Sequence, residues 1–101
     1  QAEKTLRHRD MVWEELGSIE GISFPQPQGG GNAFINITSL TPSGQRFSDY
    51  ALEEYGIPMV PGEALMGPGH VRFSFAANEK DLREAIRRFK IAVKEFPRES
   101  R

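Results

Sequence analysis

Arg72 is the residue whose type and position best suggest chemistry. It stands in the middle of an alternating segment, residues 70–76, between the apolar Val71 and Phe73. Residues two apart on a strand share a face, so Arg72 is expected on the face opposite Val71 and Phe73. A guanidinium on a rigid strand can bind a carboxylate or phosphate through two parallel hydrogen bonds. From composition alone, a structural arginine on the solvated side of a sheet is the more frequent case, and both interpretations stay open.

The other residue types with reactive side chains offer little. The chain has no cysteine, which excludes thiolate nucleophiles, disulfide scaffolds and cysteine-based zinc sites. Neither His8 nor His70 has an acid or nucleophile spaced to activate it, and two histidines alone do not make a metal site, so both are expected to be ordinary surface histidines. The run Gly29-Gly30-Gly31 is followed by no helix start and no Lys-Ser pair, so it predicts a sharp turn or close packing against another domain rather than a phosphate-binding loop.

The charged side chains on helical segments also predict no catalytic set. The adjacent pairs Glu14-Glu15 and Glu53-Glu54 diverge around a helix axis, as expected of solvated faces. A lysine that forms a Schiff base needs a desolvated, enclosed position, whereas these lysines fall outside the apolar stripes of predicted helices. The lysines are Lys4, Lys80, Lys90 and Lys94. The residues therefore offer one anion-binding candidate and no nucleophile.

Length and charge set the class of protein. A chain of 101 residues builds one modest core. Thirteen Lys and Arg against fourteen Asp and Glu give a net charge of -1, which argues against a basic nucleic-acid-binding domain. No apolar stretch approaches the roughly 20 residues of a membrane span, and no signal-type segment begins the chain, so we expect a soluble, cytoplasmic protein. The chain starts at Gln1 inside a predicted helix, so we expect a piece of a longer protein.

Three segments have the apolar spacing of amphipathic helices. The first, residues 3–19, places Leu6, Trp13 and Leu16 along one apolar stripe, with Val12 and Ile19 beside it. The second begins at its cap Ser43, ends at Gly56 and is expected to point inward Phe47, Ala51, Leu52 and Tyr55. The third begins near Asn78 and carries the strongest pattern, with Leu82, Ala85, Ile86, Phe89, Ala92, Val93 and Phe96 on one face.

Four short segments predict strands: residues 22–24, 32–37, 57–60 and 70–76. Pro58 places the third at a sheet edge. The order helix-strand-strand-helix-strand-strand-helix predicts an α+β fold, a two-layer sandwich with one apolar sheet face against helices. The chain reads as one domain, residues 1–101, with an N-terminal helical segment over 1–21 and a tail over 97–101.

Several separated motifs, taken in this order, resemble the carboxy-terminal small domain of class I/II aminotransferases, which are fold-type I enzymes of the aspartate aminotransferase kind. The likeness covers nearly the whole chain. The motifs are His8-Arg9-Asp10, Pro27-Gln28-Gly29, Ala33-Phe34-Ile35-Asn36-Ile37, Tyr55-Gly56-Ile57-Pro58-Met59-Val60-Pro61-Gly62, Gly69-His70-Val71-Arg72-Phe73-Ser74-Phe75-Ala76, and a helix that opens Asn78-Glu79-Lys80-Asp81-Leu82.

The resemblance implies a function for Arg72 and for the domain. In that family, the arginine of this strand binds the α-carboxylate of the amino-acid substrate. The cofactor, pyridoxal phosphate, is held by residues of a large domain that this chain lacks, and the small domain closes over the substrate as a lid. The parent is then expected to be a homodimeric aminotransferase that transfers an amino group from an amino acid to a 2-oxo acid, and the fragment alone is expected to be inactive.

Two alternatives stay open at this point. The chain could be a stand-alone α+β module that binds a small anion, an amino acid or a partner protein. Within the aminotransferase resemblance, the domain could also serve a transcription regulator. A nucleic-acid-binding sheet is disfavoured, because the strands lack paired exposed aromatic residues with flanking basic ones.

Overall fold

The computed structural model describes residues 2–25, 31–74 and 78–97. Three α-helices and a three-stranded sheet form a small α+β unit, which confirms the predicted fold class. In chain order the elements are α1 (Ala2–Gly17), β1 (Asn32–Asn36), α2 (Gly44–Tyr55), β2 (Val60–Pro61), the 3-10 helix η1 (Gly62–Leu65), β3 (His70–Ser74) and α3 (Glu79–Glu95).

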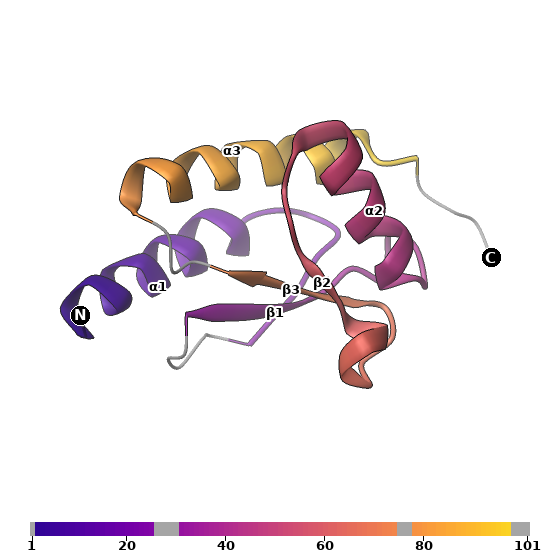
Figure 1. Cartoon of the computed structure of the whole chain (residues 1–101), viewed down its shortest axis with the longest axis horizontal. Helices are drawn as coiled ribbons and strands as arrows, with labels where there is room; N and C mark the ends of the chain where they lie inside the picture. The colour runs from indigo at the N-terminus through magenta and orange to yellow at the C-terminus, as the bar shows by residue number, and fades with distance from the viewer. Residues whose placement is uncertain (1, 26–30, 75–77, 98–101) are drawn as a thin grey trace.

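The sheet has β3 in the centre, with β1 on one side and β2 on the other, and both pairings are antiparallel. Figure 1 shows the strands below α3, which runs along the top of the molecule. In this register Arg72 lies opposite Phe34 of β1 and opposite Val60 of β2. The central strand is therefore the one that carries Arg72.

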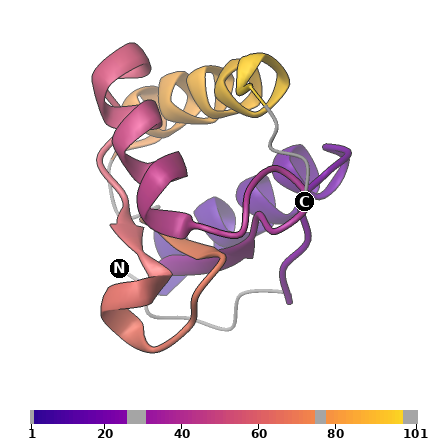
Figure 2. The same cartoon turned by 90° about the vertical axis from the view of Figure 1, so that its right-hand side faces the viewer.

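One face of the sheet is apolar and packs against the helices. Its residues on β1 and β3 are buried: Ala33, Ile35, Val71 and Phe73. Phe89 of α3 joins this face to α2, since its ring lies 5.5 Å from that of Phe73 and 5.8 Å from that of Phe47. Figure 2 shows the same arrangement from the side, with α2 and α3 above the strands. The core thus occupies the space between the sheet and the helices.

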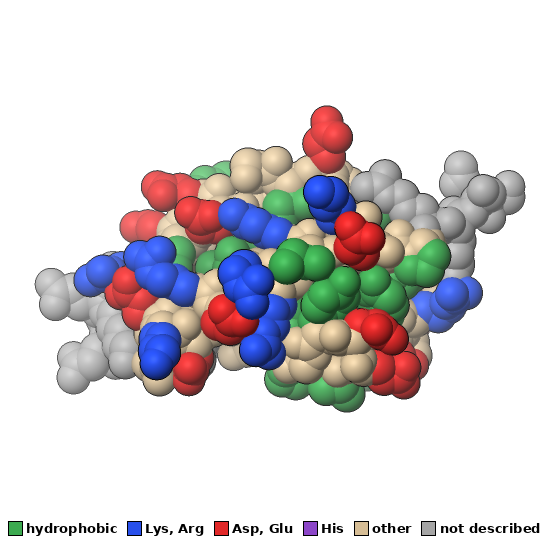
Figure 3. Space-filling model, turned by 90° about the horizontal axis from the view of Figure 1, so that it is seen from above, with side chains coloured by type: hydrophobic (Ala, Val, Ile, Leu, Met, Phe, Trp, Pro, Cys, Tyr) green, Lys and Arg blue, Asp and Glu red, His purple; other side chains and the backbone are tan. Residues whose placement is uncertain are grey.

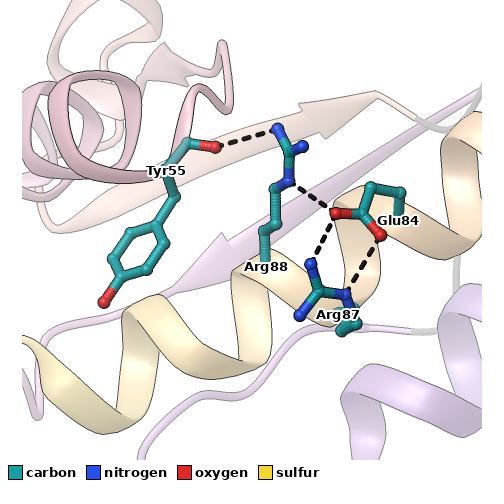
Figure 4. A network of polar contacts seen from close by, with 4 residues as sticks. All are labelled: Tyr55, Glu84, Arg87 and Arg88. Atoms are coloured by element: carbon teal, nitrogen blue, oxygen red, sulfur yellow. Dashed lines mark hydrogen bonds and ion pairs between the residues drawn. The ribbon is translucent and has the colours of Figure 1, made fainter.

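Helix α3 matches its prediction closely. Asn78 caps its start by accepting a hydrogen bond from the Asp81 backbone N–H. Six of the seven predicted inward residues are buried and Ala85 is half-buried. Arg88 also donates to the backbone oxygen of Tyr55, at the end of α2, while Arg87 and Arg88 both bond Glu84 (Figure 4). The hydrogen bond from Arg88 to Tyr55 therefore joins the two helices outside the core, while the bonds to Glu84 lie within α3.

The buried faces of α1 and α2 differ from their predictions. The side chains of Val12 and Leu16 are fully buried, but Trp13 is 39% exposed. His8 shares their i, i+4 spacing and is only 2% exposed, so the prediction of a surface histidine is wrong. Leu6 falls outside the residues whose side chains the structure describes. In α2, Leu52 is 53% exposed rather than inward, whereas Phe47 and Ala51 are buried as predicted.

Two predicted strands are shorter or absent. Residues 22–24 form only an isolated bridge, in which Ser23 and Asn36 exchange two backbone hydrogen bonds before Pro25 follows. Of residues 57–60, only Val60 pairs with β3. The backbone N–H of Ile57 instead donates to the Ala51 oxygen at the end of α2. Residues 75 and 76, predicted to continue β3, lie outside the described residues. The observed order is therefore helix-strand-helix-strand-strand-helix.

The upper surface carries both signs of charge. Figure 3 looks down on this side, and basic and acidic side chains alternate over it without a patch of one sign. Several are paired, including Lys90 with Glu15 at 2.6 Å between α3 and α1. The hydrogen bond from Lys90 holds the pKa of the Glu15 carboxyl below its usual value. Glu14 and Glu15 are exposed, as predicted for solvated helix faces.

Candidate functional site

Arg72 occupies the middle of the sheet face that the helices do not cover. It is half-buried, between Phe34 on one neighbouring strand and Val60 on the other. Strands flank it on both sides, so its backbone is fixed more firmly than that of an edge residue. The prediction that Arg72 and the pair Val71 and Phe73 lie on opposite faces is confirmed by their burial.

The guanidinium of Arg72 has no hydrogen-bond or ion-pair partner among the residues that the structure describes. Every other described arginine has an interaction partner, and five of them pair with carboxylates: Arg7, Arg9, Arg83, Arg87 and Arg88. A half-buried guanidinium has five N–H donors to satisfy, and leaving them without acceptors is unfavourable. Arg72 is therefore available to an anionic ligand.

Three other side chains share this face with Arg72. His70 lies two residues before it on β3, opposite Asn36 of β1, and its ring stacks on Phe34 at 4.8 Å with 14° between the planes. The Nδ1 atom of His70 lies 3.1 Å from the Pro68 carbonyl oxygen. His70 was predicted to be an ordinary surface histidine, and the structure instead places it half-buried within this cluster.

The loop before β3 is held in place by one carboxylate. Glu63 of η1 accepts hydrogen bonds from the backbone N–H of Gly44, at 2.8 Å, and of Gly69, at 3.3 Å. Burial raises the pKa of this carboxyl, but the backbone hydrogen bonds outweigh burial and bring the pKa below its usual value. Glu63 therefore joins the start of α2 to the residue that precedes β3.

The same loop approaches the site so closely that it needs glycine. A Cβ atom built on Gly67 would lie 2.6 Å from the Phe34 ring, and one on Gly62 would collide with the backbone oxygens of Gly67 and His70. Gly69 has a left-handed φ of +79°, a conformation that favours glycine. The absence of side chains at these positions lets the loop pack against the edge of the Arg72 face.

The glycine run lies largely outside the described residues. Gly31, the last of the three, is buried with a φ of +74°, which fits the tight turn that the sequence predicts. Glycines 29 and 30 are not described. The loop thus enters β1 through a left-handed residue.

The described lysines do not suit a cofactor that forms a Schiff base. Lys90 is half-buried and ion-paired with Glu15, and Lys80 and Lys94 are exposed on α3. A Schiff-base lysine needs a desolvated position. Within residues 2–25, 31–74 and 78–97, no group of three or more metal-binding side chains gathers, and no described helix is long and apolar enough to cross a membrane.

Sequence reasoning selected Arg72 as the candidate residue but did not predict which residues surround it. Phe34, Asn36 and His70 all carry the alternation that places them on the same face, so the period of two was the available signal. What the sequence does not display is the register that sets Phe34 opposite Arg72, because the two strands are separated by α2 and β2.

Comparison with known proteins identifies the family. The family described as aminotransferase class I and II matches residues 1–89. An aspartate aminotransferase of Pyrococcus horikoshii is 34% identical to this chain, and the match covers 84% of this chain and 22% of the relative. A probable aspartate/prephenate aminotransferase of Aquifex aeolicus is 35% identical, and the match covers 89% of this chain and 24% of the relative. The solved structure of an aromatic aminotransferase from Pyrococcus horikoshii superposes with a TM-score of 0.84 and 32% identity, over 92% of this chain and 25% of that one.

These matches extend over most of the chain, although it spans only about a quarter of the length of the relatives. They agree in sequence and in three-dimensional structure, which a local motif would not produce. The chain belongs to the class I and II aminotransferase family.

Proposed function

We propose that this chain is the C-terminal small domain of a pyridoxal-phosphate-dependent aminotransferase, and that Arg72 binds the α-carboxylate of the amino-acid substrate. The observation that carries the proposal is the guanidinium of Arg72, half-buried on the central strand of an aminotransferase-family domain and without a partner among the described residues. An acceptor with two oxygens in one plane matches its two-pronged donor.

The position on β3 suits this role energetically. Ordering a flexible side chain on binding reduces affinity, and a residue anchored between two strands has less freedom to lose. The face that carries Arg72 is not the face that forms the core, so a ligand can reach Arg72 without the core being opened. Arg72 would then orient the substrate by its carboxylate.

The cofactor would be held by the rest of the parent protein. When bound, pyridoxal phosphate supplies the electron sink for amino-group transfer. The described lysines are exposed or ion-paired, so they do not fit the cofactor attachment, and no step is assigned to them. The contribution proposed for this chain is carboxylate binding and closure over the substrate, which excludes water from the reacting groups.

The proposal extends to the assembly. The large domain of the same parent chain is the expected partner of this domain, and the parent is expected to be a homodimer in the cytoplasm. Support comes from the family and from the chain's length, which is about a quarter of that of its relatives and the size of one domain.

The test is the substitution Arg72→Lys in the full-length protein that contains this chain. Lysine keeps the positive charge but loses the planar fork, and a hydrogen bond to a charged group contributes about 1.5 to 3 kcal/mol. We expect kcat/KM for amino acids to fall by about one to two orders of magnitude, with little change in melting temperature.

The matched comparison is Phe73→Ala, the neighbouring residue on the opposite face. Phe73 is buried against Phe89, so its removal should cost about 3 to 5 kcal/mol of stability. Unchanged kcat/KM in Arg72→Lys would show that Arg72 does not bind the substrate. A loss of melting temperature as large as that of Phe73→Ala would show that Arg72 is a structural arginine.

A further inference from the structure

The strand on one side of Arg72 is short. β2 consists of Val60 and Pro61 alone, and Val60 is the residue that lies opposite Arg72. Pro61 has no backbone N–H, so it donates no hydrogen bond to β3. On the other side, β1 pairs with β3 over all five of its residues. Backbone pairing therefore holds Arg72 less firmly on the β2 side than on the β1 side.

A side-chain contact adds a second attachment on the β2 side. Glu63 follows β2 by two residues, and its Oε2 atom accepts from the backbone N–H of Gly44 at 2.8 Å and from that of Gly69 at 3.3 Å. Gly44 is the first residue of α2, and Gly69 directly precedes β3. One carboxylate oxygen thus ties the connection between β2 and β3 to the start of a helix, at the end of the sheet where β3 begins (Figure 1).

The two glycines that Glu63 joins have little room to rearrange. Both are buried, and a Cβ atom on Gly44 would lie 2.1 Å from the His70 backbone oxygen. The carbonyl oxygen of Gly69 is also engaged, since it accepts from the backbone N–H of Ile37 at 2.9 Å. Without the Glu63 carboxylate, two buried N–H groups would lack this acceptor, which is unfavourable. The backbone at the start of β3 would then have to shift to recover partners.

We propose that Glu63 is a positioning residue for Arg72. Through Gly69 it fixes the point at which β3 leaves the loop, and thereby the direction of the guanidinium three residues further along the strand. An arginine that is already fixed loses little freedom when it binds a carboxylate, so loosening the start of β3 lowers the affinity. The inference rests on the proposed function and adds a second residue to it.

The contact lies wholly within this chain. Glu63 and both of its partners are described here, so the attachment does not depend on the rest of the parent protein. A purely structural role for Glu63 would lower the stability of the domain and leave substrate binding unchanged. A positioning role would weaken binding of the α-carboxylate, and only while Arg72 is present to bind it.

The experiment uses the full-length protein that contains this chain, with aspartate and phenylalanine each tried as amino donor and 2-oxoglutarate as acceptor. In Glu63→Ala we expect the donor KM to rise about three- to tenfold while kcat changes by less than about twofold, because the contact acts on carboxylate binding. The KM for 2-oxoglutarate should rise by a similar factor, since it carries a carboxylate in the same position. Glu63→Gln keeps one acceptor oxygen, so its KM should lie between those of wild type and Glu63→Ala.

Arg72→Lys supplies the decisive comparison. The lysine ammonium is a point charge on a flexible stem and needs no fixed fork. If Glu63 acts through Arg72, adding Glu63→Ala to Arg72→Lys should change KM by less than about 1.5-fold. A residue that affected binding independently of Arg72 would multiply KM by the same factor in both backgrounds.

Gly56→Ala is the matched control for lost stability. Gly56 has a φ of +68° at the far end of α2, so alanine there is strained and destabilises the domain without touching the Glu63 contact. Its KM values should stay within about twofold of those of the wild type, because no contact near Arg72 is changed.

Three results would overturn the inference while leaving the proposed function intact: an unchanged KM in Glu63→Ala, a rise by the same factor in the wild-type and Arg72→Lys backgrounds, or an equal rise in Gly56→Ala. Unchanged kcat/KM in Arg72→Lys alone, or a wild-type protein that transaminates neither donor, would instead refute the proposed function. Should Glu63→Ala fail to fold, Glu63→Gln carries the same comparisons.

Discussion

Replacing Glu63 by glutamine tests how the strand that carries Arg72 is held in position. The carboxylate accepts from the backbone N–H of Gly44 and of Gly69, and Gly44 is the first residue of α2. Negative charge at a helix N-terminus is favourable, because the helix dipole and the free N–H groups are positive there. Glu63→Gln keeps the shape of the side chain and removes its charge.

The magnitude follows from these two hydrogen bonds. Bonds to charged groups contribute about 1.5 to 3 kcal/mol against about 0.5 to 1.5 kcal/mol for neutral ones, and the exposure of Glu63 reduces the difference through solvent screening. We therefore expect Glu63→Gln to lower the free energy of unfolding by about 1 kcal/mol at neutral pH. For a domain of this length, that corresponds to a fall in melting temperature of about 4 to 8 °C.

The loss should depend on pH with a definite sign. The pKa of Glu63 in the folded chain lies below its usual value of 4.5, so the carboxylate stabilises the fold fully above pH 4.5. This stabilisation disappears as the pH falls below 4.5 and through the folded-state pKa. The difference between wild type and Glu63→Gln should therefore be largest at pH 7 and shrink in acid.

Thermal and denaturant unfolding of the 101-residue chain at pH 7 and in acid would measure this difference. Glu53→Gln is the control, because Glu53 is exposed on α2 and forms no hydrogen bond or ion pair with the described residues. The reasoning is refuted if Glu63→Gln is no less stable than Glu53→Gln at pH 7, or if its deficit persists unchanged in acid.

Two further predictions concern other parts of the molecule. Gly17→Ala should raise the free energy of unfolding by about 0.4 to 1 kcal/mol, because a Cβ at the end of α1 meets nothing within 4 Å. Gly44→Ala should instead destabilise the chain, because its Cβ would collide with the His70 backbone oxygen. Denaturant unfolding of both variants would separate these cases. Hydrogen bonds from Arg87 and from Arg88 lower the pKa of the Glu84 carboxyl to about 2. An NMR titration should therefore find this carboxyl ionised to unusually low pH, and Arg87→Ala should raise its pKa. A titration near 4.5 in the unaltered chain would contradict the contacts in Figure 4.

The helices that sequence reasoning predicted best are those whose signals agree at several levels. In α3 the apolar spacing, the cap Asn78 and the breaker Pro97 all indicate the same bounds. In α2 the cap Ser43 and the left-handed Gly56 were predicted, although the exposure of Leu52 was not. Local chemistry decides where a helix starts and ends, but tertiary packing decides which of its apolar residues are buried.

The errors arise where the tertiary neighbours override residue type. Histidine is commonly exposed or partly exposed, yet His8 is buried because it precedes Val12 and Leu16 by one and two helical turns on the same face. Residues 22–24 have the composition of a strand, but Ser23 finds a single pairing with Asn36. In both cases the deciding information is the position of a partner element, which a pattern along one segment does not contain.

The division of β3 into two faces connects stability and function. Val71 and Phe73 are buried in the core, while His70 and Arg72 alternate with them on the uncovered face. The strand pairing that buries Val71 and Phe73 therefore also fixes the positions of His70 and Arg72. Its register sets Phe34 of β1 opposite Arg72. A core mutation that shifts this register by one residue would move Arg72 from the uncovered face to the helical one. The carboxylate binding proposed for Arg72 would thus be coupled to the core through strand register, even though Arg72 itself contributes little to the core.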